Sequence, residues 1–195
     1  GTYTFSSNST SISINGDVAT ILAYTPSAIS ITALQEGSGN YISGSTTIPL
    51  FVNRATPTYQ SVSQITKTYG VDVSFSLASI VAGISNSDGN YSLFSSTSSA
   101  ISIENDVVTI LEYTPSGITI TASQDASGNY ASSSKDISLL VNRGPATYQP
   151  ISQITKIYGT DASFSLTPYM VGVSNSSGAY TFSSTSAKIS ISGDI

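Results

Sequence analysis

The chain of 195 residues contains no histidine, no cysteine and no tryptophan, and it has a single methionine. Without histidine it lacks the usual general base near neutral pH and the usual partner of a nucleophilic serine. Without cysteine it can form no disulfide, no thiolate nucleophile, no iron–sulfur cluster and no common type of structural zinc site. We therefore predict a protein that is not an enzyme and has no cofactor.

Charge is also scarce, because charged residues make up only 9% of the chain and the net charge is −5. Six Lys and Arg residues cannot neutralise many phosphates, so we expect no nucleic-acid partner. No apolar run approaches the roughly 20 residues that span a bilayer, and no signal peptide is present. The first residue is glycine rather than methionine, which predicts an internal piece of a longer protein.

Internal similarity is the strongest feature of what is there. The stretch SISINGDVATILAYTPSAISITALQEGSGNY from Ser11 aligns with AISIENDVVTILEYTPSGITITASQDASGNY from Ala100, an offset of 89 residues. The same offset relates the stretches that begin at Val52 and Val141, and a third copy begins at Gly178. This period is too long for a solenoid repeat and fits a whole small domain.

Two linkers divide the chain, at residues 53–57 and 142–145, and each contains a proline that cannot join a central ladder. They predict three parts, which we call the first, middle and third segments. Residues 1–54 are the C-terminal part of one repeat, residues 55–143 a complete repeat, and residues 144–195 the N-terminal part of another.

Apolar residues alternate with Ser and Thr along many short runs, which is typical of half-buried antiparallel strands. Turn residues separate these runs, and no stretch shows the apolar spacing of a helix. We therefore predict an all-β fold, with six to eight short strands per repeat in a β-sandwich. The apolar runs are Ile12/Ile14, Ile29/Ile31, Ile48/Leu50/Val52, Phe75/Leu77, Ile101/Ile103, Ile118/Ile120, Ile137/Leu139/Val141 and Phe164/Leu166; the turns are Asn15-Gly16, Thr25-Pro26, Gly39-Asn40, Tyr69-Gly70 and Asp88-Gly89.

The pattern from Phe94 through residues 101–103, 107–111 and 118–122 to Tyr130 resembles bacterial immunoglobulin-like domains. Residues 154–159 and 164–166 resemble the first two strands of that family. Such domains occur in tandem in invasin- and intimin-type adhesins and in phage and large-virus surface proteins. The resemblance implies tandem immunoglobulin-like antiparallel β-sandwiches. The middle repeat departs from it by one extra residue near Leu93, which leaves the strand register there open.

Recurring carboxylates are the first candidates for a site, because a pair of them can serve as acid and base in glycoside hydrolysis. All of them lie beside turn residues, where a carboxylate caps backbone amides. We interpret them as structural and predict no catalytic residue. The set is Asp17, Asp106 and Asp194; Glu36 and Asp125; and Asp72 and Asp161.

Calcium needs only oxygen ligands, and Asn86, Asp88 and Asn90 have the spacing of a ligand loop. The copy of this loop has Asn175, Ser177 and Ala179 and loses the charge. The acidic run Glu104-Asn105-Asp106 is likewise not repeated. Its copies are Asn15-Gly16-Asp17 and Ser192-Gly193-Asp194, which each keep only one acid. We interpret both runs as turns and predict no metal site.

Two kinds of side chain could form covalent links. An isopeptide bond would need Lys67 or Lys156 to meet Asn53 or Asn142, and spacing alone cannot place them in contact. Sequons at Asn8, Asn90 and Asn175 matter only in a glycosylating pathway.

Recurring tyrosines could stack on sugars, but aromatic residues at strand ends more often close a sandwich. The recurring tyrosines are Tyr24/Tyr113, Tyr41/Tyr130, Tyr59/Tyr148 and Tyr69/Tyr158.

The resemblance and the repeats together imply a non-catalytic stalk or fibre of a long extracellular protein, at a cell or virion surface, supporting adhesion or display. Its partners would be neighbouring repeats of the same chain, with copies of itself or a surface glycan or receptor as further partners. Two alternatives stay open: a carbohydrate- or receptor-binding module, and a virion or filament subunit assembled through β-sheet pairing.

Overall fold

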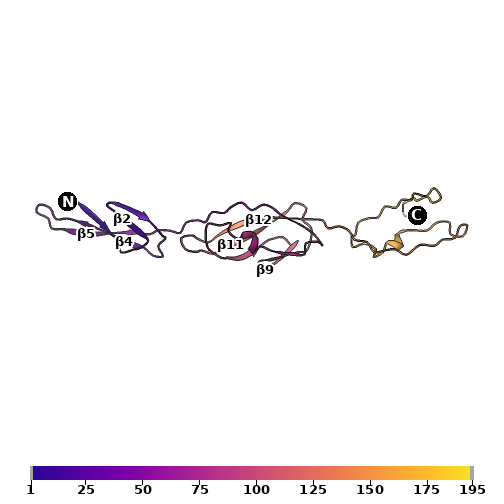
Figure 1. The fold of residues 1–195 in the computed structure, drawn as a ribbon, viewed down its shortest axis with the longest axis horizontal. Coiled ribbons are helices and arrows are strands. Elements are labelled where there is room, and N and C mark those ends of the chain that lie inside the picture. The colour runs from indigo at the N-terminus through magenta and orange to yellow at the C-terminus, as the bar shows by residue number, and fades with distance from the viewer. Residues whose placement is uncertain (1, 194–195) are drawn as a thin grey trace. The chain divides into compact units, whose positions relative to one another are not determined.

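A computed structural model describes residues 2–193 of the chain. These residues form short strands joined by turns, so the chain is all-β, as predicted. It forms two compact units, Gly1–Arg143 and Gly144–Ile195. The first unit contains the first and middle segments, and the second unit is the third segment (Figure 1).

The first segment contains two small antiparallel sheets. One has the strand order β1-β4-β5, and the other is the hairpin β2-β3. Pro49 lies in β5, where the edge position tolerates a residue without an N–H. The strands are β1 (Tyr3–Ser6), β2 (Ile12–Asn15), β3 (Val18–Ile21), β4 (Ile29–Gln35) and β5 (Gly44–Leu50).

The middle segment contains a four-stranded sheet, β6-β12-β11-β8, and a three-stranded sheet, β7-β10-β9. Every pairing is antiparallel except that of β6 with β12, which is parallel. The elements are β6 (Ile65–Thr68), β7 (Ser74–Ser76), α1 (Ala78–Val81), β8 (Tyr91–Ser95), β9 (Ile101–Glu104), β10 (Val107–Ile110), β11 (Ile118–Gln124) and β12 (Ser133–Asn142).

The two sheets of the middle segment share one apolar core. Most of its members come from alternate positions of the strands, so the period-two pattern sets which strand face is buried. Leu77 and Val81 come instead from the N-cap and the last residue of α1. Each fully buried aliphatic side chain contributes about 1.5–3 kcal/mol of transfer free energy. The cluster consists of Leu77, Val81, Phe94, Ile101, Val108, Ile110, Ile120, Ala122, Ile137, Leu139 and Val141.

Helical turns are the main departure from the predicted elements. Helix α1 follows β7, and the 3-10 turn η1 (Thr167–Met170) stands at the same place in the third segment. The Leu77 carbonyl accepts the N–H groups of Ile80 and Val81 at 2.9 and 3.0 Å. A single turn of four residues is too short to show the periodicity by which a helix is recognised in a sequence.

The third segment shows a second departure, because residues 144–193 contain no assigned strand. Phe164 and Leu166 were expected in a strand like that of Phe75. In the middle segment β6 pairs with β12 and β7 pairs with β10. Residues 144–193 hold no counterpart of either partner, and a strand forms only when its backbone groups are paired.

The extra residue of the middle repeat forms a β-bulge. Phe94 and Leu93 face Ala122 and Ser123, but Gln124 faces Tyr91, so Ser92 is the residue left over. In the first segment the equivalent pairing of β1 with β4 runs without a shift. An inserted residue is accommodated in this way because a bulge keeps the flanking side chains on their original faces.

Candidate functional site

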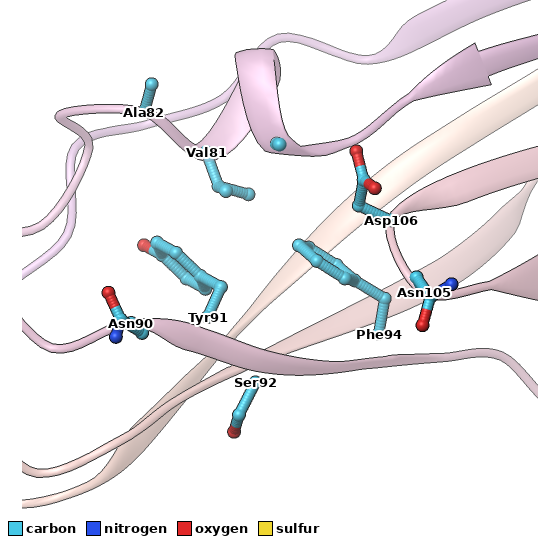
Figure 2. Close-up of a pocket in the computed structure, with 9 residues that line it drawn as sticks. Val81, Ala82, Asn90, Tyr91, Ser92, Phe94, Asn105 and Asp106 are labelled. Carbon is cyan, nitrogen blue, oxygen red and sulfur yellow. The ribbon is translucent and has the colours of Figure 1, made fainter.

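A hollow with a volume of about 520 Å³ lies between α1 and β8 in the middle segment. Figure 2 shows Val81 and Ala82 above it and the rings of Tyr91 and Phe94 on β8 below it, with Ser92 pointing away. The turn between β9 and β10 closes one end with Asn105 and Asp106. Its lining is Ala78, Val81, Ala82, Asn90, Tyr91, Ser92, Phe94, Asn105 and Asp106.

Two aromatic rings fill the floor of this hollow. Tyr91 and Phe94 stack with ring centroids 6.2 Å apart and planes at 20°, facing Val81 (Figure 2). Burial raises the pKa of the Tyr91 phenol, and Tyr59 adds to the shift. The Tyr91 hydroxyl is buried and has no hydrogen-bond partner among the described residues. A phenol with a raised pKa stays protonated at neutral pH, so it offers no base there.

The same aromatic pair recurs in all three segments. Tyr3 and Phe5 stack at 6.3 Å and 24°, and so do Tyr180 and Phe182. The bulge at Ser92 therefore preserves the stacking despite the insertion. A pair that recurs with the same geometry in every copy is a packing feature of the repeat.

Asp106 is the one acid of the hollow, and it holds the start of α1. The Ser76 hydroxyl donates to the Asp106 carboxylate, and this bond is the main reason that the pKa of Asp106 is lowered; a hydrogen bond from the Ala78 backbone adds to the effect. The Leu77 N–H donates to the Asp106 carbonyl at 2.7 Å. A carboxylate with a lowered pKa is ionised at neutral pH and cannot act as a general acid.

The other recurring acids also lie in turns or accept local hydrogen bonds. Asp72 accepts the N–H of Thr68 at 2.8 Å, and Asp161 accepts that of Ile157 at 2.8 Å. Asp125 accepts the Ser92 hydroxyl at 2.7 Å. Asp17 lies in the turn between β2 and β3, Glu36 follows β4, and Asp194 lies outside the described residues.

Two of the calcium candidates accept hydrogen bonds from backbone groups 28 positions away in the chain. The Asn86 side-chain oxygen accepts the N–H of Thr58 at 2.8 Å, and that of Asn175 accepts the N–H of Thr147 at 2.9 Å. Asp88, Asn90 and Glu104 are exposed. Within residues 2–193, no group of three or more acidic, histidine or cysteine side chains is placed to hold a metal ion.

Lys67 contacts an acid and a ring rather than an amide. Its ammonium lies 3.4 Å from the Asp72 carboxylate and 5.2 Å from the centroid of the Phe75 ring. Lys156 lies 4.8 Å from the centroid of the Phe164 ring. Asn53 and Asn142, the amide candidates for an isopeptide bond, are exposed, as are the sequon residues Asn8, Asn90 and Asn175.

Some of the recurring tyrosines form side-chain hydrogen bonds across the middle segment. The Tyr59 hydroxyl donates to the Gln124 side chain at 3.3 Å, and the Tyr130 hydroxyl accepts from Asn86 at 3.3 Å. Gln124 is buried and also donates to the carbonyls of Ser87 and Gly89. Among the recurring tyrosines, the exposed ones are Tyr41, Tyr69, Tyr113, Tyr148 and Tyr158.

Tyr24 and Tyr113 each form a pair with an arginine, which we call the Tyr–Arg pair. The Arg54 guanidinium lies 4.3 Å from the Tyr24 ring centroid and donates to its hydroxyl at 2.9 Å. Arg143 does the same to Tyr113, at 4.5 and 3.0 Å. The roles of the two arginines and of the buried Gln124 were not predicted from the sequence. The arginines recur at the same 89-residue offset as their tyrosines, and this recurrence is the signal that could have indicated the pairs.

No helix of the described residues is long and apolar enough to span a membrane. Comparisons with family models, with curated proteins and with solved structures find no match to the chain. The side chains gathered in the described part of the chain pack, cap turns and pair with one another.

Proposed function

We propose that the chain is a non-catalytic structural segment of a long extracellular surface protein. In this proposal, tandem immunoglobulin-like β-sandwich domains of about 89 residues form a stalk or fibre that supports cell adhesion or surface display. Equivalent hydrogen bonds 89 residues apart support the repeat. Thr25 and Val52 exchange two bonds, as Thr114 and Val141 do, with each threonine hydroxyl accepting a valine N–H at 2.8–2.9 Å.

The observation that carries the proposal is the parallel pairing of β6 with β12. Strand β6 lies near the start of the middle segment and β12 ends it, at Asn142. Four residue pairs join them, from Leu139 with Ile65 to Asn142 with Thr68. Because the strands are parallel, a pull on the two ends of the segment shears all these pairs at once instead of opening them one by one. This geometry suits a segment that carries tension.

Single-molecule force measurement on the whole chain, held by its two ends, tests the proposal. We expect one principal unfolding event, after which the 89 residues of the middle segment have an extended length of about 290–320 Å, at about 3.3–3.6 Å per residue. Thr66→Pro in β6 and Ser102→Pro in β9 are a matched pair, since both residues are exposed and lie in four-residue edge strands.

The two variants should lose comparable thermal stability, because each removes one strand residue at a sheet edge. Only Thr66→Pro should lower the unfolding force markedly. A chain that extends smoothly without a force peak, or equal force losses in the two variants, would contradict a tension-bearing role.

A further inference from the structure

The first and middle segments, which belong to one compact unit, meet at the turn of residues 127–130. We call it the Asn129 turn. It lies between β11 and β12, and its end residues Ser127 and Tyr130 exchange two backbone hydrogen bonds at 3.1 and 2.9 Å. The Asn129 side-chain oxygen accepts the N–H of Tyr24 at 3.0 Å, across 105 positions of the chain. A turn of the middle segment therefore bonds directly to the preceding segment.

The residue that Asn129 meets is itself held firmly in the first segment. Tyr24 lies in the loop from β3 to β4, and its ring and hydroxyl contact Arg54, which follows β5. Its neighbour Thr25 exchanges two hydrogen bonds with Val52. The Ser11 hydroxyl, just before β2, donates to the Tyr24 carbonyl at 3.4 Å. A bond to the Tyr24 N–H thus fixes a loop that is anchored beside both sheets of the segment.

The linker is fastened to the same turn. The Asn129 carbonyl accepts the N–H of Ala55 at 2.8 Å, and the Ala55 carbonyl accepts the N–H of Ala131 at 2.8 Å. These two bonds place Ala55 beside Tyr130 in a parallel bridge. The linker is therefore paired like a strand residue at the point where it leaves the Tyr24–Arg54 pair.

A second anchor follows three residues later. The Thr58 N–H donates to the Asn86 side-chain oxygen at 2.8 Å, and the Asn86 N–H donates to the Thr58 carbonyl at 3.2 Å. The Asn86 amide also donates to the Tyr130 hydroxyl at 3.3 Å, which ties the second anchor to the Asn129 turn. Between the two anchors lie Thr56 and Pro57, and the ring of the buried Pro57 fixes its φ. Little backbone freedom is left in the linker.

Two separate points of attachment matter because neighbouring domains move relative to one another by default. Bonds to the linker alone would let the first segment pivot about residue 54, since all of them hold one stretch of chain. The bond from Asn129 to Tyr24 holds the first segment at a second place, 30 positions from Arg54. It therefore opposes the rotation that the linker bonds would allow.

We propose that the Asn129 turn and the Tyr24–Arg54 pair form an interdomain lock, which holds the first and middle segments as one rigid body. Asn129 is its positioning residue, because its side chain fixes Tyr24 while its backbone fixes Ala55. The surface of the Tyr24–Arg54 pair thus fits the asparagine-bearing turn of the repeat that follows it. As a means of keeping direction along a stalk the lock rests on the proposed function, but as a contact between two segments it does not.

Distances between two spin labels on the whole chain test the lock. The chain has no cysteine, so Ser13→Cys and Ser102→Cys together give two unique labelling sites. Both serines are exposed, lie in four-residue strands and are equivalent residues of the two segments, 89 positions apart. We expect pulsed electron paramagnetic resonance to give a single narrow distance distribution.

The main variant is Asn129→Ala, which removes the side-chain acceptor and keeps the backbone bonds of the turn. Loss of one hydrogen bond should raise the population outside the main distance about 2- to 10-fold. Asn129→Asp keeps an acceptor oxygen and should retain the narrow distribution. Asn40→Ala is the matched control, because Ser38 and Tyr41 exchange the same two backbone bonds in the equivalent turn of the first segment. It should leave the distances unchanged.

A second variant approaches the lock from the preceding segment. Arg54→Ala removes the partner of the Tyr24 ring and hydroxyl and leaves every residue of the middle segment intact. It should broaden the distribution in the same sense, so the test does not depend on how Asn129→Ala affects its own turn. Arg143→Ala removes the same partner from Tyr113 and is the control that should change nothing.

A broad distribution in the original chain overturns the proposal. It is overturned as well if Asn129→Ala and Arg54→Ala stay narrow, or if they broaden the distances no more than their controls. A broad distribution in Asn129→Asp overturns the role of the side-chain acceptor. The unfolding force depends on the pairing of β6 with β12, whose residues take no part in the lock, so the proposed function and the lock can fail separately.

Discussion

The first segment and the second half of the middle segment have similar sequences but different burial. Both form the same three-stranded order, β1-β4-β5 in one and β8-β11-β12 in the other, and both have a hairpin, β2-β3 or β9-β10. Yet Leu139 is fully buried while its equivalent Leu50 is only half-buried. Strand pairing and turns therefore need only the local sequence and its neighbours. A closed core also needs residues 65–81.

The largest test of this comparison truncates the same side chain in both segments. Ile137→Ala should lower the free energy of unfolding of the middle segment by about 2–5 kcal/mol, because it empties a closed core. Ile48→Ala should cost less than about 1 kcal/mol, because Ile48 is already partly in water. Urea denaturation at a concentration where the chain is monomeric measures both values. Equal losses would show that the two faces are equally covered.

A second test concerns the buried threonines. Thr114→Val removes the hydroxyl that accepts the Val141 N–H, and leaving that buried donor unpaired should cost about 1–3 kcal/mol in the middle segment. Thr25→Val removes the same bond to Val52 and should not move the unfolding transition of the middle segment. If both variants shift that transition, the two segments unfold as one cooperative unit.

A smaller effect is expected at the bulge. Deletion of Ser92 gives the middle segment the spacing of Tyr3 and Phe5, which stack without a bulge. The deletion loses the bond to Asp125 and should change the stability by no more than about 1 kcal/mol. Thermal denaturation of the original chain and of the deletion variant measures this change in stability. A loss as large as that of Ile137→Ala would mean that the bulge positions the core.

The smallest effect concerns pH. The pKa of Asp106 is lowered in the folded chain by the Ser76 hydroxyl, so the stability from this bond is present above the unfolded pKa of about 3.9. It is lost as the pH falls through the lower folded value. Ser76→Ala should reduce the dependence of stability on pH in this range. Asp17→Asn, at the equivalent acid of the first segment, is the control and should leave this pH dependence unchanged. A change of pH dependence in Asp17→Asn but not in Ser76→Ala would contradict the role of the Ser76–Asp106 bond.

Particular residues show what could be predicted. The alternation around Ile137 and around Ile120 predicted strands that the structure contains, because a period of two is decided by the chain itself. The turn at Asn15-Gly16 was predicted from its residues, and Gly16 has the positive φ of 64° that such a turn favours. The extra residue near Leu93 was visible as a change of spacing, and it became the bulge at Ser92.

Other features could not be predicted because they depend on residues far apart in the chain. Helix α1 is too short to leave a periodic signal. The Tyr–Arg pairs join residues that lie 30 positions apart, and the bond from Tyr24 to Asn129 spans 105 positions. The strand expected at Phe164 did not form, since its pairing partner is not among residues 144–193.

The amino-acid sequence by itself determined the all-β class, the alternation that assigns each strand two faces and the chemistry of the turns, because these follow from neighbouring residues. Only the tertiary structure decided which of these faces are buried, which tyrosines meet an arginine and where Asn129 makes its contacts. The physical reason is that burial and pairing are properties of two surfaces that meet. The same isoleucine is core at residue 137 and exposed surface at residue 48 according to what covers it.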